Sequence, residues 1–206
     1  MEKYIFDTNL FFNMESGLNL AKKTEDVVVE VTKIAKRLKK ENTGIIFMPP
    51  RAIDEFLSFF ENKQQLFLKE FLSTITIKSP DIHKIQFPSG VFYAIVEDIR
   101  QRSHRGLNIG EEEIVNAAKK AEGKGSFQKK DFEIMVGSVI TTFRDRYRKA
   151  TRFGFIDSLT DLDLIVLAKE QDAFLISSDE GVMKWAKTFG VKEMPPGVWQ
   201  QRVHPE

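Results

Sequence analysis

The stretch that decides the fold is DLDLIVLAKEQDAFLISSDEG, residues 161–181. Its first half carries apolar residues at helical spacing. Its second half is a short apolar run that ends in a serine pair and Asp179. A helix followed by a buried strand and a polar loop is the repeating unit of α/β proteins. The segment therefore predicts a parallel sheet with an acid just past the carboxyl end of one strand.

The rest of the chain outside its middle third follows the same pattern. Short apolar runs that predict strands are YIF (4–6), GIIFMPP (44–50) and ITIK (75–78). Segments that predict helices are 25–40, 51–60, 63–75 and 182–191. Strands separated by helices indicate an α/β fold with a central parallel sheet and helices on both faces.

The middle third is different, because it predicts helices only. One long helical pattern spans 91–123 and is interrupted near Gly106 and Gly110, and a second spans 131–154. The residues between them, 123–130, predict a flexible turn. We therefore expect a long helical hairpin at 83–152, inserted into an α/β domain made of 1–82 and 153–206.

Composition bounds the kind of protein. The chain has 206 residues, 42% of them hydrophobic and 30% charged, with a net charge of +1 and no cysteine. These values exclude disulfides and thiolate metal sites, and an anionic partner would need a local basic patch. The N-terminus is too acidic for a signal peptide, and no apolar run approaches the roughly 18 residues that span a bilayer. We expect a cytoplasmic protein that does not bind membranes.

Acidic residues follow the predicted strands. Asp7 comes directly after YIF, Asp179 follows FLISS, and Glu55 lies near the start of the helix after GIIFMPP. The carboxyl ends of parallel strands share one edge of a sheet, where ligands bind. We expect these three acids to meet there, and we prefer Glu55 to its neighbour Asp54 because Phe56 follows it directly.

A further acidic cluster, Asp157, Asp161 and Asp163, precedes the apolar run of residues 164–168. Ser158 and Asp161 have the spacing of a capping box, so each acid could simply cap a helix. On a helix, Asp157 and Asp161 are about 40° apart, whereas Asp163 is about 200° from Asp161 and points elsewhere. Asp163 is therefore the weakest member of the expected site.

Crowded carboxylates repel one another unless a cation neutralises them. Oxygen ligands without cysteine or a histidine pair favour Mg²⁺, with Mn²⁺ as the alternative, over zinc. Such sites activate water and hold phosphate oxygens. The acids therefore predict a metal site for phosphodiester chemistry.

Several of these segments resemble the PIN-domain nucleases, metal-dependent enzymes that cut RNA. They are YIFDTN, RAIDEF, the stretch 161–181 and VMKWAKTFGV. The resemblance implies that Asp7, Glu55, Asp161 and Asp179 are site residues, with Asn9 and Ser177 as polar neighbours.

The sequence of 145–192, with the helical insert before it, is similar to the small protein-only ribonuclease P family, whose members are also known as RNA ligase partner proteins. This similarity implies removal of the 5′ leader from precursor tRNA without an RNA subunit. It also implies homo-oligomers built from dimers through the insert, up to a dodecamer. The catalytic aspartates that it implies are Asp7, Asp157, Asp161 and Asp179, which would bind the metal, with Asp163 as a further acid.

The segment FRDRYRKATR (143–152) is basic and precedes the acidic cluster in sequence. Guanidinium groups suit phosphate oxygens because each forms paired hydrogen bonds. The alternative is a solvated helix face, which is the commoner meaning of a charge run. We favour RNA binding, and the family resemblance implies tRNA contacts for Arg144 and Arg148. The candidate residues are Arg144, Arg146, Arg148 and Arg152.

The insert also has an apolar face. It is formed by Phe92, Ile95, Val96 and Ile99 in the first helical segment and by Ile134, Val136, Val139, Ile140 and Phe143 in the second. The two helices could bury these residues against each other, or leave surface that favours self-association. The functional expectation is an endoribonuclease of the ribonuclease P type. The alternatives are a toxin-like PIN ribonuclease and a non-catalytic RNA-binding partner of an RNA ligase.

Overall fold

The computed structural model describes residues 1–13, 18–123, 125, 128–152, 154–156 and 158–203. The chain forms two compact units. One contains Met1–Pro88 with Ile156–Glu206, and the other contains Ser89–Phe155. These limits differ from the sequence-based domain boundaries, 82/83 and 152/153, by six and three residues.

The larger unit is built on a five-stranded sheet in which every neighbouring pair is parallel. The strand order is β3-β2-β1-β4-β5. The strands are β1 (Glu2–Phe6), β2 (Gly44–Met48), β3 (Thr76–Ile77), β4 (Phe174–Ile176) and β5 (Lys192–Met194). The first strand is therefore central, and β4, formed late in the sequence, lies beside it. The predicted parallel α/β fold is confirmed.

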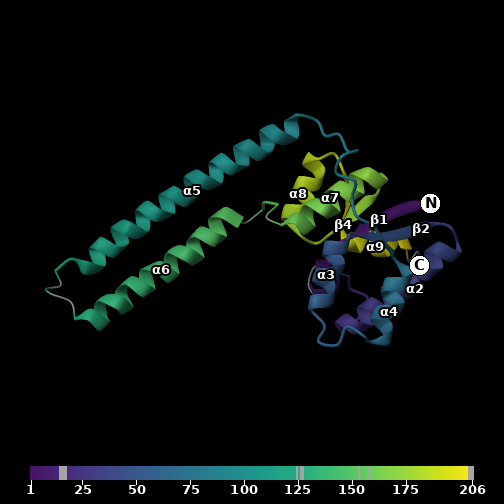
Figure 1. Cartoon of the computed structure of the whole chain (residues 1–206), viewed down its shortest axis with the longest axis horizontal. Coiled ribbons are helices and arrows are strands. Elements are labelled where there is room, and N and C mark those ends of the chain that lie inside the picture. The colour runs from purple at the N-terminus through teal and green to yellow at the C-terminus, as the bar shows by residue number, and fades with distance from the viewer. Residues whose placement is uncertain (14–17, 124, 126–127, 153, 157, 204–206) are drawn as a thin grey trace. The chain divides into compact units, whose positions relative to one another are not determined.

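Helices cover both faces of this sheet, with α7 and α8 on one side and α2 and α4 on the other (Figure 1). Most sequence-based helices are confirmed within a few residues. The helices of this unit are α1 (Asn9–Phe12), α2 (Thr24–Lys40), α3 (Pro50–Ser58), α4 (Leu66–Thr74), α7 (Leu159–Gln171), α8 (Glu180–Thr188) and α9 (Pro196–Val203). Neither β5 nor α9 was predicted. The strand β5 has only three residues and lies at the sheet edge. The helix α9 begins at the second of two consecutive prolines, which predicted an irregular tail.

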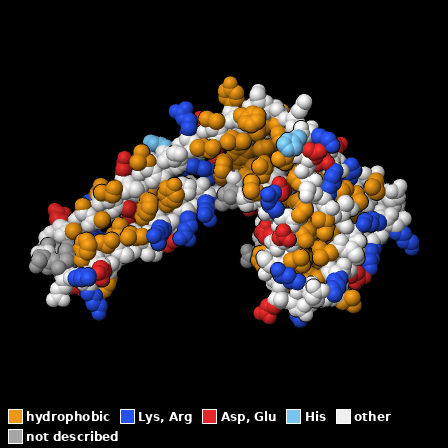
Figure 2. Space-filling view, viewed as in Figure 1, with side chains coloured by type: hydrophobic (Ala, Val, Ile, Leu, Met, Phe, Trp, Pro, Cys, Tyr) orange, Lys and Arg blue, Asp and Glu red, His pale blue; other side chains and the backbone are white. Residues whose placement is uncertain are grey.

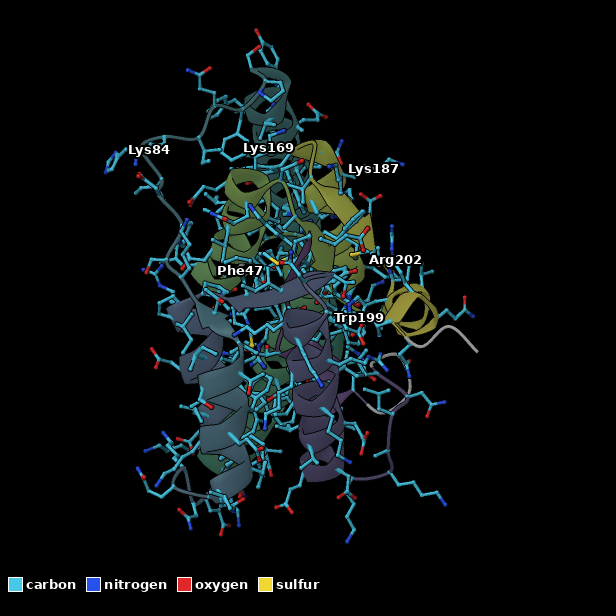
Figure 3. The ribbon with its side chains drawn as sticks, turned by 90° about the vertical axis from the view of Figure 1, so that its right-hand side faces the viewer. Phe47, Lys84, Lys169, Lys187, Trp199 and Arg202 are labelled. Atoms are coloured by element: carbon cyan, nitrogen blue, oxygen red, sulfur yellow. The ribbon has the colours of Figure 1, made fainter. Side chains whose placement is uncertain are left out.

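Aromatic side chains from several elements join in the core beside β1. Trp199 of α9, labelled in Figure 3, is fully buried. It packs edge-on against Phe6, with ring centres 4.8 Å apart. Phe11 packs on Phe56 of α3 and Phe71 of α4. Residues immediately after β1 and on α3 are therefore anchored in the same apolar core, which fixes the polar groups next to them.

The smaller unit is a hairpin of two long helices, α5 (Gly90–Ala121) and α6 (Lys129–Arg152). The expected interruption near Gly106 and Gly110 is wrong, because α5 continues through both. A Cβ atom at Gly106 would lie 2.7 Å from the ring of Tyr147 in α6. This glycine is therefore a place of close helix contact and not a helix break.

The hairpin leaves most of its apolar residues outside. Phe92, Val96 and Ile99 of α5 are 61%, 56% and 48% exposed, and Ile134 and Ile140 of α6 are 62% and 42% exposed. Hydrophobic side chains spread along the hairpin (Figure 2). The two helices therefore leave much of this face exposed, although Ile95, Val136, Val139 and Phe143 are partly buried. In the described part of the chain, no helix is long and apolar enough to cross a membrane.

Candidate active site

Asp7 lies at the carboxyl end of the central strand and is only 2% exposed. Its backbone N–H donates to the carbonyl of Ile176 at 3.1 Å, which continues the pairing of β1 with β4 by one residue. Its carboxylate accepts hydrogen bonds from the Thr8 hydroxyl and the Asn9 backbone N–H, both at 3.3 Å. The side-chain amide of Asn9 donates at 3.5 Å. The short DTN sequence therefore surrounds its own carboxylate with donors.

Ser177 links this carboxylate to the end of β4. Its hydroxyl is buried and donates to Oδ2 of Asp7 at 2.6 Å. The hydroxyl oxygen of Ser177 also accepts a hydrogen bond from the backbone N–H of Asp179 at 3.0 Å. Asp7 and Asp179 therefore lie on the same edge of the sheet, as the parallel strand order predicts.

Asp179 is also the N-cap of α8. Its Oδ1 accepts the backbone N–H groups of Gly181 and Val182 at 2.7 and 3.0 Å. Both cap bonds use the same oxygen, so the cap does not require Oδ2. An exposed aspartate held in this way can cap the helix and present its second oxygen to a ligand.

Glu55, on the first turns of α3, is electrostatically coupled to Asp7. Burial raises the pKa of Glu55, and the negative charge of Asp7 raises it further, while a hydrogen bond from Thr8 opposes both. Its neighbour Asp54 is exposed. The structure thus brings the preferred glutamate toward Asp7, and Thr8 lies between the two carboxylates.

The cluster before α7 is only partly described. Ser158 is the N-cap of α7, and its hydroxyl accepts the backbone N–H of Asp161 at 3.0 Å. This confirms the predicted capping role of Ser158 and places Asp161 in the first helical turn. Asp157 lies outside the described residues. The roles of Asp157 and Asp161 at the metal site remain predictions.

Asp163 has a partner of its own. It is largely buried, and its Oδ2 lies 2.6 Å from Nη1 of Arg51 on α3. The side chain therefore joins α7 to α3. This ion pair accounts for the burial of Asp163 without a metal ion, which agrees with its poor helical phase relative to Asp161.

Burial makes the charged form of Asp7 unfavourable. Burial raises its pKa above the ordinary value, and the charge of Asp179 adds to this, whereas the bonds from Ser177, Asn9 and Thr8 act in the opposite direction. A divalent cation would favour the charged forms. The donors are carboxylate and hydroxyl oxygens, so their chemistry fits Mg²⁺ or Mn²⁺. Among the described residues, no three acidic, cysteine or histidine side chains form a complete ligand group.

Sequence inspection missed two residues of this region. Thr8 is 1% exposed and touches both carboxylates, and the only indication was its position between Asp7 and Asn9. Arg51 neutralises Asp163, and its place four residues before Glu55 was the available indication. A buried hydroxyl and a paired arginine leave no periodic pattern in a single sequence.

The predicted basic residues of α6 have two different environments. Arg144, Arg148 and Arg152 are exposed. Arg146 instead forms ion pairs with Glu112 and Glu113 of α5, which raises the pKa of its guanidinium. An arginine held by two carboxylates is a weaker candidate for RNA contact than its neighbours.

A second basic run, IRQRSHRG (99–106), lies on α5 and is also partly structural. Arg102 is 7% exposed, pairs with Asp98 and donates to the backbone carbonyl of Thr151. Arg105 donates to the carbonyl of Ala150 at 3.2 Å. Both side chains join α5 to the end of α6, so this part of the run stabilises the hairpin.

Comparison with known proteins agrees with this geometry. A family model described as PINc domain ribonuclease matches residues 3–204. A protein of Thermodesulfovibrio yellowstonii named RNA-free ribonuclease P is 34% identical over 194 residues, which cover 94% of this chain and 89% of the relative. A protein of the same name from Methanocaldococcus jannaschii is 32% identical over 204 residues, covering 93% of this chain and 86% of the relative.

Proposed function

The chain belongs to the PINc-domain ribonucleases and, within them, to the RNA-free ribonuclease P proteins, and from this premise we propose that it removes the 5′ leader of precursor tRNA. It is an endoribonuclease that hydrolyses one phosphodiester bond and leaves a 5′ phosphate on the tRNA. The observation that carries the proposal is the meeting of Asp7, Ser177 and Asp179 at one edge of the sheet, with Glu55 coupled to Asp7.

Each acid has a proposed task. Asp7, Asp161 and Asp179, with Asp157, would hold a divalent cation, Mg²⁺ or alternatively Mn²⁺. When bound, such a cation polarises phosphate oxygens and makes water more acidic. Glu55 orients the attacking water and accepts its proton at a carboxylate oxygen, which its raised pKa favours. Asp163 has a structural task through Arg51.

Two features of the hairpin fit a folded RNA substrate. The exposed Arg144, Arg148 and Arg152 can each bind a phosphate through paired hydrogen bonds. The exposed apolar residues of α5 and α6 support a homo-oligomer built from dimers through the hairpin, with the dodecamer of the related family as the largest expected form. Such an assembly recognises RNA by shape rather than by sequence. The proposed place of action is the cytoplasm, where precursor tRNA is processed.

The direct test is to map the 5′ ends of products from precursor tRNA, with Mg²⁺ and with a chelator. A single metal-dependent cut at the mature 5′ end is expected, and unrelated RNA should remain intact. Sequence-specific cuts in both RNAs would instead indicate a toxin-like ribonuclease. Tight binding without any cut would indicate a non-catalytic partner protein.

The assigned residues are tested by Asp161→Asn. Cleavage should fall by about two to three orders of magnitude, the size expected when one electrostatic contact to the reacting group is lost, while tRNA binding is retained. Asp54→Asn is the matched control, because Asp54 is an exposed acid beside Glu55. Cleavage by the Asp161 variant at the rate of the control would show that the assigned site is wrong.

A further inference from the structure

Three residues on successive turns of helix α3 lie near the acidic edge of the sheet. Arg51, Glu55 and Phe59 are four residues apart, and the helical geometry continues through Phe59, which has φ −77° and ψ −10°. Each step of four advances about 6 Å along the axis and turns about 40°. Arg51 pairs with Asp163, and Glu55 is coupled to Asp7. Phe59 is therefore one turn beyond the acidic edge, on the same side of the helix.

Phe59 forms a flat aromatic pair with Phe12. The ring centres are 3.9 Å apart and the planes differ by 24°. Phe12 is the last residue of α1, only five residues after Asp7. The pair is thus tied to the site twice, through α3 to Glu55 and through α1 to Asp7.

The pair is rigid on one side and open on the other. Phe12 also contacts Phe56 and Phe60, with ring centres 5.8 and 5.9 Å away, and Phe56 is fully buried. Phe59 itself is 56% exposed, although one face of its ring is covered by Phe12. An aromatic ring held from behind by the core and open in front is a stacking surface.

We propose that Phe59, supported by Phe12, stacks on an unpaired nucleobase of the 5′ leader beside the scissile phosphate. The inference rests on the proposed function and names a further subsite of it. In precursor tRNA the mature 5′ end is base-paired in the acceptor stem, so the unpaired bases on the 5′ side of the cut belong to the leader. Stacking needs only the π face that every base has, and it therefore accepts leaders of any sequence.

The role of Phe59 is tested by measuring RNA binding in the presence of a chelator, which prevents cleavage. Fluorescence anisotropy compares precursor tRNA with leaderless tRNA for the wild type, Phe59→Ala, Phe59→Leu and Phe59→Trp. Loss of one stacked base should weaken binding of the precursor by about five- to a hundredfold for the alanine and leucine variants. The tryptophan variant should bind as the wild type does, and leaderless tRNA should not distinguish the four proteins.

Leu66→Ala is the matched control, because Leu66 is 80% exposed and lies at the start of α4. It should leave both affinities unchanged. Thermal unfolding of each variant shows whether the fold is retained. If the leucine variant binds as tightly as the wild type, apolar area and not stacking is sufficient, and the inference is overturned.

The RNA side uses precursor tRNA with single abasic nucleotides in the leader and in the 3′ tail. One leader position should weaken binding to the wild type yet have no effect on Phe59→Ala. Sensitivity confined to the 3′ tail, or equal sensitivity of both proteins at every position, overturns the assignment. The proposed function is judged separately, since it fails if the wild type does not cut precursor tRNA, whereas only this inference fails if Phe59→Ala cuts and binds normally.

Discussion

Ser177 donates a 2.6 Å hydrogen bond to the buried carboxylate of Asp7 from the end of the neighbouring strand. This bond favours the charged form of Asp7, in opposition to burial, and the same hydroxyl also fixes the backbone of Asp179. Ser177 therefore favours the charge of Asp7 and links its carboxylate to the backbone of Asp179.

Replacing Ser177 by alanine removes both bonds. We expect kcat/KM for precursor tRNA to fall about tenfold, equivalent to about 1.4 kcal/mol. The pKa of Asp7 should rise further, so the acidic limb of the pH–rate profile should move to higher pH. Ser73→Ala, which removes an exposed hydroxyl on α4, is the control. A lower rate with an unmoved acidic limb would contradict the proposed effect on Asp7.

The charge of Asp7 should make the metal-free protein less stable as the pH rises. Its folded pKa lies above the ordinary 3.8, so the folded state binds more protons than the unfolded state. This contribution is fully present below pH 3.8 and is lost as the pH rises through the folded pKa. In a chelator, Asp7→Asn should therefore gain thermal stability relative to the wild type with increasing pH.

Mg²⁺ should reverse the order of thermal stability and make the wild type more stable than Asp7→Asn. The cation should bind the folded wild type and stabilise it by mass action, whereas the asparagine variant lacks one of the proposed ligands. Melting temperatures at several pH values, with Mg²⁺ and with a chelator, provide the measurement. Parallel curves for the two proteins in the chelator would show that Asp7 does not titrate as proposed.

The Arg51–Asp163 pair should stabilise the junction of α3 and α7. Arg51→Met leaves a largely buried carboxylate without its partner and should cost about 1–3 kcal/mol, between the values for exposed and buried pairs. Urea unfolding of the single variants, Asp163→Asn and the double variant gives the coupling energy. Lys33→Met, which breaks an exposed pair, should change stability by about 0.5 kcal/mol or less. Additive effects of the two single variants would rule out the coupling.

Gly106 and Gly137 of the hairpin should respond oppositely to replacement by alanine, because only Gly106 is closely packed. At Gly106 a methyl group would meet the ring of Tyr147 at 2.7 Å, so Gly106→Ala should lower the melting temperature of the hairpin. At Gly137 nothing lies within 4 Å, so Gly137→Ala should stabilise α6 by about 0.5–1 kcal/mol through helix propensity. Helix loss is followed by circular dichroism. Stabilisation by both substitutions would mean that the helices are not closely packed at Gly106.

Self-association through the hairpin predicts sensitivity to charge on its apolar face. Val96→Glu and Ile140→Glu should lower the molar mass measured by light scattering after size exclusion, since each places a carboxylate in the proposed contact. Ser138→Glu introduces the same charge at an exposed polar position of α6 and should leave the mass unchanged. An unchanged mass for the two apolar variants would place the contact elsewhere.

The sequence predicts the scaffold of this protein well because apolar periodicity and parallel topology are strong constraints. The parallel α/β pattern alone predicts that Asp7 and Asp179 lie on one edge of the sheet. The spacing of Ser158 and Asp161 predicts that Ser158 caps a helix. The prediction that the helix is interrupted at Gly106 was wrong, because close packing against Tyr147 outweighs the low helix propensity of glycine.

The partners of buried polar groups were harder to predict. Arg51 is 112 residues from Asp163 in sequence, and no local pattern joins them. The link between Thr8 and Glu55 likewise depends on how α3 leaves β2, which only the folded backbone defines. The same holds for β5, whose three residues gain their strand form by pairing with β4.

The bond between Asp7 and Ser177 also has a consequence for biosynthesis. Its two ends are 170 residues apart, so a ribosome translates Asp7 long before Ser177. A growing polypeptide cannot assemble the cutting centre before β4 has emerged and docked beside β1. RNA cleavage is therefore expected only after β4 has been translated and has paired with β1.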